Sequence, residues 1–154
     1  MSIGPDLLPL PHINAHFRLD IDGVDTTDFS QCTGLSGEVG VEEYAEGGEN
    51  RFTHRFPSRA GFGNLVLKQG AGPGLGLWQW WGEYLTDGVV KPRDGQVHLL
   101  AWRDGAVVPV RAWAFTRGWP VKMSGPDLDA MSAAIAVETM EIAHHGLRLL
   151  ELGG

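Results

Sequence analysis

We consider two side chains of the 154-residue chain, Cys32 and Ser36, as candidate catalytic nucleophiles, and neither belongs to a recognisable catalytic set. Cys32 is the single cysteine, and a thiol beside a histidine can form a covalent intermediate. A free cysteine is more often a small buried hydrophobic residue. Ser36 lies in the sequence Gly-Leu-Ser-Gly, which differs from the Gly-x-Ser-x-Gly elbow of hydrolases. We interpret Cys32 as a packing residue and keep a hydrolase as a minor alternative.

Possible metal ligands are present but poorly spaced for a shared ion. Four aspartates crowd between positions 20 and 28: Asp20, Asp22, Asp25 and Asp28. They lack the glycine and the terminal glutamate of an EF-hand loop, so we interpret them as solvated carboxylates. His144 and His145 are adjacent, and neighbours on a strand point to opposite faces. His12 and His16 have helical spacing within a proline-rich stretch that disfavours a helix. We therefore predict neither a metal nor a cofactor.

The glycine-rich run 70–76 could suggest a phosphate-binding loop. No Lys-Ser or Lys-Thr pair follows it, and the Gly-x-Gly-x-x-Gly order of dinucleotide folds is absent, so a turn is the better interpretation. The formal net charge of -7 and the scattered lysines and arginines argue against nucleic-acid binding. The first residues lack the pattern of a signal peptide, and we expect synthesis in the cytoplasm and no stable membrane insertion.

The elements around these residues follow an alternating pattern. Strands are expected at 17–21, 38–44, 51–56, 64–68, 96–102 and 106–113, the last with a continuation to Trp119. Pro57 and Pro120 are expected to end their strands. Asp22-Gly23 and Asp104-Gly105 are turn signals. The segment 131–144 fits a helix or a strand. A single domain of about seven strands with one flanking helix is expected, a mainly β fold of sandwich or barrel type. It would span residues 1–154, with 1–15 as an extended arm.

The expected helix covers residues 77–85. Its apolar stripe consists of Leu77, Trp78, Trp81, Tyr84 and Leu85, at the spacing of an amphipathic helix. Trp80 falls outside this stripe. We therefore expect Trp80 to be exposed and to serve as an interface residue, because aromatic side chains are enriched in interfaces.

Several longer runs carry a resemblance to a known family. They are CTGLSGEVGVEEYAEGGENRFTHRF at 32–56, NLVLKQG at 64–70, LWQWW at 77–81, WAFTRGWPVKMSGPDL at 113–128 and AVETMEIAHHGL at 136–147. In this order and spacing, the chain from Phe17 onward resembles the T4-like phage tail tube protein family, which includes the inner tube proteins of extracellular contractile injection systems.

The resemblance implies both a fold and an assembly. The fold is a β-sandwich or barrel with one flanking helix, similar to type VI secretion tube proteins, and the final segment is then a strand. Six copies form a ring, and rings stack into a hollow tube within a contractile sheath. Expected partners are the sheath protein, baseplate or hub proteins, tube-terminating proteins and lumen cargo. The protein is then a non-enzymatic structural subunit of a phage tail or phage tail-like particle.

By the same resemblance, the hairpin near 42–56 reaches toward the adjacent ring. Its contact candidates are Glu42, Tyr44, Glu46, Glu49, Asn50, Arg51 and Arg55. Polar contacts of this kind would set the register between rings. The family's helix lies toward the outside of the tube or between subunits, which suits an exposed Trp80.

Three further hypotheses accompany the tube assignment. From the net charge we expect an acidic or neutral lumen through which cargo slides. A tube-initiator paralogue at the baseplate is a close alternative to the major tube subunit. A small-ligand-binding β-barrel module that uses the tryptophans is the alternative from a different functional class.

Overall fold

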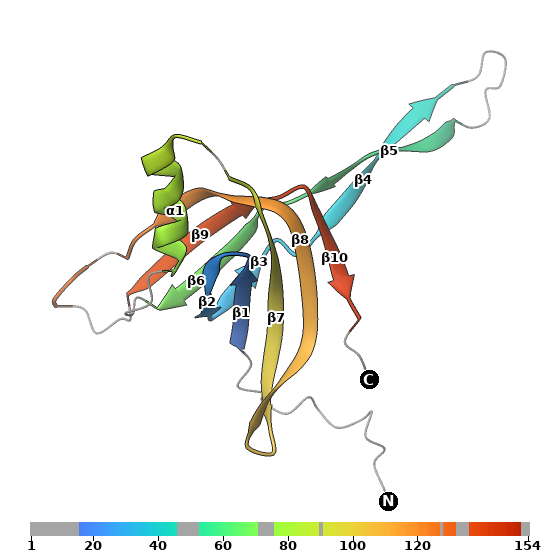
Figure 1. Ribbon diagram of the computed structural model, residues 1–154. Helices are drawn as coiled ribbons and strands as arrows, with labels where there is room; N and C mark the ends of the chain where they lie inside the picture. The colour runs from blue at the N-terminus through green and yellow to red at the C-terminus, as the bar shows by residue number, and fades with distance from the viewer. Residues whose placement is uncertain are drawn as a thin grey trace, which may run out of the picture.

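The computed structural model describes residues 16–45, 53–70, 76–89, 91–126, 128–131 and 136–151 (Figure 1). Within them the chain forms ten strands and one α-helix. In chain order these are β1 (His16–Ile21), β2 (Val24–Phe29), β3 (Gln31–Thr33), β4 (Gly37–Tyr44), β5 (His54–Phe62), β6 (Leu65–Gly70), α1 (Gly76–Asp87), β7 (Arg93–Arg103), β8 (Ala106–Ser124), β9 (Val137–Ala143) and β10 (Gly146–Leu150).

Eight strands form one antiparallel sheet that curls on itself. The hydrogen-bonded order is β2-β1-β7-β8-β9-β6-β3, and β10 pairs with β8 beside this path. β2 and β3 stand at opposite ends of the path but follow one another in the chain, and the backbone N–H of Ser30 between them donates to Lys68 O at 2.8 Å. The two ends of the sheet therefore meet. The predicted mainly β class with a flanking helix is confirmed.

The core lies inside the curled sheet. Burial alternates along β9, where Met140 and Ile142 face inward, as a strand with one solvated face requires. The largest fully buried side chains are Phe115, Leu19, Leu65, Leu67, Met140, Ile142 and Val97. The ambiguity of segment 131–144 is resolved to a strand over 137–143, while 132–135 lie outside the described residues.

The helix α1 packs against β2 and β8, and its orientation corrects the prediction for Trp80. The Trp80 side chain is only 2% exposed and belongs to the core. Leu77, Trp80 and the half-buried Trp81 form the docking stripe, with the spacing i, i+3, i+4. Tyr84 and Leu85 point to solvent instead. Periodicity allowed both stripes on this tryptophan-rich helix, and the place where the helix docks selects one of them.

Two prolines lie inside strands that they were expected to end. β5 continues through Pro57 to Phe62, and β8 continues through Pro120 to Ser124. A register shift lies beside each proline, between Val39 and Val41 on the strand facing Pro57 and between Pro120 and Lys122. A bulge tolerates a residue that has no N–H for the ladder. The strands therefore bend at these prolines and do not stop there.

The β7–β8 turn matches its sequence signal. Asp104 and Gly105 have φ angles of 50° and 78°, as a two-residue type I′ hairpin requires. Among the described residues, β1 pairs with β7 from Gly95 to Leu100, and the turn at Asp104-Gly105 follows these pairs along β7. Figure 1 shows this turn at the lower end of the molecule, and the β4–β5 hairpin projects from the opposite, upper end. The single helix of the described residues, the 12-residue α1, is too short to cross a membrane.

Candidate interaction surfaces

The possible catalytic thiol has the wrong electrostatic environment for a nucleophile. Cys32 is half-buried, and burial raises the pKa of its thiol to about 11. The nucleophilic form is the thiolate, so the group is almost entirely inactive near neutral pH. Its sulfur contacts the Thr33 carbonyl at 3.9 Å. This environment fits the packing role expected from the sequence.

The adjacent histidines point in different directions. The Nε2 of His144 lies 3.1 Å from Gly63 O, and its Nδ1 accepts a hydrogen bond from the Gly146 N–H at 3.2 Å. The ring of His145 instead packs against Trp119, with the centroids 5.5 Å apart. The two imidazoles therefore make contacts with different parts of the chain. Within the described ranges, no three His, Cys, Asp or Glu side chains are arranged to hold a metal ion.

The aspartates near the first turn are likewise divided among separate contacts. The Nε of Arg18 donates to the Asp28 carboxylate at 2.7 Å, and this hydrogen bond holds the Asp28 pKa below its usual range. Asp22 contributes its backbone oxygen, not its carboxylate, to a contact with Arg93. The Asp28 contact joins β2 to β1, and the Asp22 contact joins the β1–β2 turn to β7.

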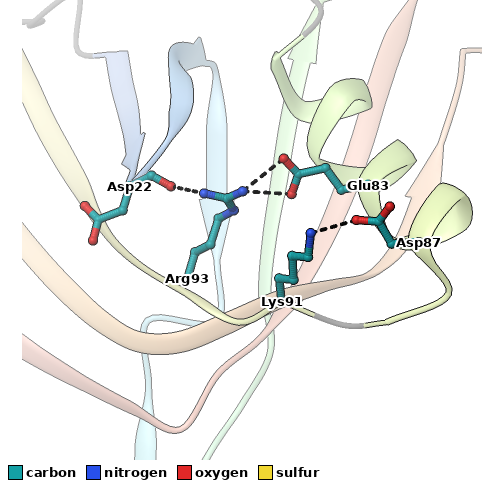
Figure 2. Close-up of polar contacts among 5 residues, drawn as sticks. All are labelled: Asp22, Glu83, Asp87, Lys91 and Arg93. Atoms are coloured by element: carbon teal, nitrogen blue, oxygen red, sulfur yellow. Dashed lines mark hydrogen bonds and ion pairs between the residues drawn. The ribbon is translucent and has the colours of Figure 1, made fainter.

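A polar cluster fixes α1 to the sheet (Figure 2). One terminal nitrogen of Arg93, on β7, donates to both carboxylate oxygens of Glu83, on α1, at 2.9 Å each. The other donates to Asp22 O at 2.6 Å, at the β1–β2 turn. Gly23 follows in that turn with a φ of 77°, and a Cβ there would collide with the Arg93 guanidinium. A second pair, Lys91 with Asp87 at 2.7 Å, lies at the end of the helix. The cluster connects α1 with β7 and with the β1–β2 turn.

The β4–β5 hairpin is the most exposed regular element. It pairs with no strand of the main sheet within the described chain, and every residue of β4 is exposed. Val39 and Val41 lie on one face, and Tyr44 and Phe56 lie on the other. Tyr44 is 59% exposed and Val41 is 53% exposed. Isolated two-stranded hairpins are only marginally stable in water, and exposed apolar side chains favour a partner.

The predicted contact residues map onto this hairpin only in part. Glu42 and Tyr44 lie on β4, and Arg55 lies on β5 facing Glu43 at 3.9 Å. That ion pair is largely exposed and adds little stability. The remaining candidates, Glu46, Glu49, Asn50 and Arg51, lie outside the described residues. Trp80 is not part of any exposed surface, as described above.

Sequence reasoning missed a second exposed surface, at the β7–β8 hairpin. Trp102 is 56% exposed, and its cross-strand partner Val107 is also exposed. The available signal was a tryptophan two positions before the Asp104-Gly105 turn. β10 was missed too; within the described residues it pairs with β8 alone, so its outer edge is open, and Leu149 on it is exposed.

Comparison with known proteins places these surfaces in a family context. The model of the family described as T4-like virus tail tube protein gp19 matches residues 13–148. No curated protein matches the chain significantly.

Solved structures share the fold. A chain from an extracellular contractile injection system, the PVC sheath-tube complex in the extended state, has a TM-score of 0.77 at 20% identity, with 98% of this chain and 100% of that chain covered. A chain of the anti-feeding prophage baseplate has a TM-score of 0.71 at 24% identity, with 97% of each chain covered. A type six secretion system protein has a TM-score of 0.57 at 12% identity, covering 87% of this chain and 82% of that one.

Proposed function

Because the chain belongs to the T4-like virus tail tube protein gp19 family, we propose that it is the major structural subunit of the inner tube of a phage tail or contractile injection system. Six copies form a ring, and rings stack into a hollow tube inside a sheath. Contraction of the sheath drives the tube through a target envelope. The protein acts by binding copies of itself and catalyses no reaction.

The exposed β4–β5 hairpin is the observation that carries this proposal. In a monomer, the valines on one face of this hairpin and the aromatic rings on the other are open to water, so little apolar burial stabilises the hairpin. Contact with another copy would bury these side chains. The hairpin thus suits the stacking contact, with Glu42, Tyr44 and Arg55 among the residues that touch the next ring.

The ring contact is assigned to the sheet edges. Among the described residues, the outer edge of β10 has no partner strand, and such edges pair readily with a strand of another chain. A head-to-tail contact of this kind closes into a ring when the rotation that relates neighbouring copies is an integer fraction of a full turn. The sheath, baseplate and tube-terminating partners of the tube are part of the same proposal.

Mass measurement against protein concentration tests the proposal. Light scattering and native mass spectrometry should find species at six times the 16.7 kDa chain mass and at multiples of that hexamer. The double variant Val39→Ser/Val41→Ser should keep the hexamer and lose the larger multiples. Val89→Ser, at an exposed valine after α1, is the matched control and should assemble normally. A chain that stays monomeric at every concentration, with and without baseplate components, would contradict the proposal.

The likeness to a baseplate chain supports a second candidate, a tube initiator. An initiator is present as one ring per particle, whereas a major subunit repeats along the whole tube. Quantitative mass spectrometry of purified particles separates them, because a major subunit is present in many copies per particle and an initiator in the copies of a single ring.

A further inference from the structure

The β7–β8 hairpin carries an exposed apolar patch close to its turn. Trp102 is 56% exposed, and its cross-strand partner Val107 is 38% exposed. Leu100 and Pro109 form the next pair on the same face, and with Val107 they line part of a groove of about 760 Å³. We call Leu100, Trp102, Val107 and Pro109 the tryptophan patch. An exposed tryptophan beside a groove is the type of residue that anchors a contact.

The first described residue of the chain lies beside this patch. β1 pairs with β7 in an unbroken antiparallel register that reaches His16 opposite Leu100. β7 continues beyond Leu100 through residues 101–103. With the same register, residues 13–15 fall opposite residues 101–103. The segment that precedes His16 is therefore tethered two strand positions from Trp102.

We propose that this segment covers the tryptophan patch of its own chain. Residues 13–15 continue β1 along β7, and residues 7–11 cross the face of the hairpin over Trp102 and Val107. The proposal concerns the single chain and goes beyond the proposed tube function, because it needs no ring or stack.

The composition of residues 7–11 suits this role. The run reads LLPLP, three leucines and two prolines, and it holds no charged side chain. Proline fixes its φ angle and favours the extended polyproline II conformation. Proline-rich segments in this conformation dock on aromatic surfaces at a low entropic cost. The leucines supply the apolar area that an exposed tryptophan can bury.

The segment also has the length that the contact requires. Five residues in the polyproline II conformation span about 15 Å, at about 3.1 Å per residue. Neighbouring strands lie about 4.8 Å apart, so residues 7–11 can cross both strands of the β7–β8 hairpin. Attachment at His16 gives the segment a high effective concentration beside the patch. This tether favours docking within one chain over docking on a second copy.

A continued β1 also has a consequence for the sheet edge. Among the described residues, β7 at 101–103 pairs with β8 on one side and has no partner on the other. Open edges pair readily with strands of other chains, and a covering segment prevents this. The segment would thus protect this end of the sheet, whereas the outer edge of β10 stays available for the proposed ring contact.

Photo-crosslinking of the full-length chain tests the docked segment. Trp102→p-benzoylphenylalanine places an aromatic probe in the patch, and Leu149→p-benzoylphenylalanine places the same probe at an exposed position on β10 as the control. Each labelled chain is mixed with an excess of isotopically heavy, unlabelled chain and irradiated. Trypsin releases residues 1–18 as one peptide, since Arg18 is the first basic cleavage site. Mass spectrometry then shows whether the attached peptide is light or heavy and at which residues it is attached.

The probe at position 102 should attach to residues 7–11 of its own light chain, and the probe at position 149 should not. Attachment to the heavy peptide would mean that a second copy supplies the segment, and it would overturn the proposal. Attachment elsewhere, with none to residues 7–11, would overturn it as well. Either result would leave the tube proposal intact.

Two changes within the segment separate docking from mere proximity. Pro9→Gly/Leu10→Ser/Pro11→Gly keeps the tether and should lower the yield of the light crosslink several-fold. Pro5→Gly, in the same segment but outside the docked residues, is the matched control and should leave the yield unchanged. Circular dichroism checks that the variants are folded. Equal yields from the triple variant and the unchanged segment would show that the tether alone brings the two together, which would overturn the docking.

Hydrogen exchange tests the continuation of β1. Deletion of residues 2–15 should speed amide exchange within residues 101–103 several-fold, because the backbone on that side of β7 loses its partner. Exchange in β9, at residues 137–143, should not change and shows that the sheet is kept. Unchanged exchange at 101–103 would overturn the pairing of residues 13–15 with β7.

Discussion

The curled sheet and the β4–β5 hairpin are built from the same kind of alternating strand, but they differ in what covers their faces. In the sheet, every second side chain of β9 is buried, and Met140 and Ile142 pack in the core beside Leu67. In the hairpin, Val39 and Val41 have the same spacing on β4, and both are exposed. The alternation therefore specifies a strand and does not say whether the apolar face is covered by the chain itself or by another copy.

The strongest test of this contrast is a truncation in the core. Leu67 is 1% exposed and sits among the core residues of the sheet. Leu67→Ala should lower the free energy of unfolding by about 2–5 kcal/mol. The transfer free energy of the removed atoms is lost, and the cavity that remains destabilises the folded state further. Urea denaturation of the monomer measures this change. A loss below about 0.5 kcal/mol, the range of surface substitutions, would mean that the core is not packed as described.

A smaller effect is expected where α1 is fixed to the sheet. Glu83→Ala removes two charge-assisted hydrogen bonds to Arg93. Both side chains are partly exposed, so the expected loss is about 1 kcal/mol. Asp87→Ala, which removes the exposed pair with Lys91, is the control and should change the stability little. Equal effects of the two variants in urea denaturation would show that the Arg93 contact does not hold the helix.

The base of the hairpin should respond to pH. The His144 ring lies between Phe62, at the end of β5, and Phe115 in the core, and burial lowers its pKa in the folded protein. In the unfolded chain the value is about 6.5. Between these two values the unfolded state binds the proton more readily, so the contribution to stability is present above pH 6.5 and is lost as the pH falls below it.

Protonation also removes the Nδ1 acceptor of the Gly146 N–H. The wild-type protein should therefore lose stability between pH 7 and pH 5. His144→Phe keeps an aromatic ring at the position and should show a flatter pH profile in urea denaturation. Identical profiles for the two proteins would exclude this histidine as the cause.

The smallest change in monomer stability is expected on the hairpin itself. Val41 is already half exposed in the monomer, so Val41→Ser should alter the free energy of unfolding by no more than about 0.5 kcal/mol. The same variant should reduce the formation of species larger than one ring in light scattering. If Val41→Ser instead destabilises the monomer as strongly as Leu67→Ala, the hairpin face is covered within the chain and the contrast fails.

The sequence predicted the strands whose periodicity is local, and it missed features that depend on a neighbouring element. The alternation at 17–21 and the Asp104-Gly105 turn both correspond to observed elements. Pro57 and Pro120 were wrongly expected to end strands, because the bulges that accommodate them involve the register with a partner strand.

Exposure was harder to predict than secondary structure. Trp80 was assigned to the surface and is buried, because the docking position of α1 decides which of two possible stripes faces the core. Trp102 was missed, because the exposure of a side chain near a hairpin turn depends on what packs beside the turn, which the local pattern does not contain. Four hairpin candidates, Glu46, Glu49, Asn50 and Arg51, lie outside the described residues, so their contacts stay predictions.

Electron microscopy of the purified full-length chain at high concentration, alone and with baseplate components, tests the central claim most directly. Six-fold rings and hollow tubes are expected, with the β4–β5 hairpin of each copy reaching into the neighbouring ring in a reconstruction. Particles in which this hairpin remains fully exposed to solvent, or a protein that forms no ring under either condition, would contradict it.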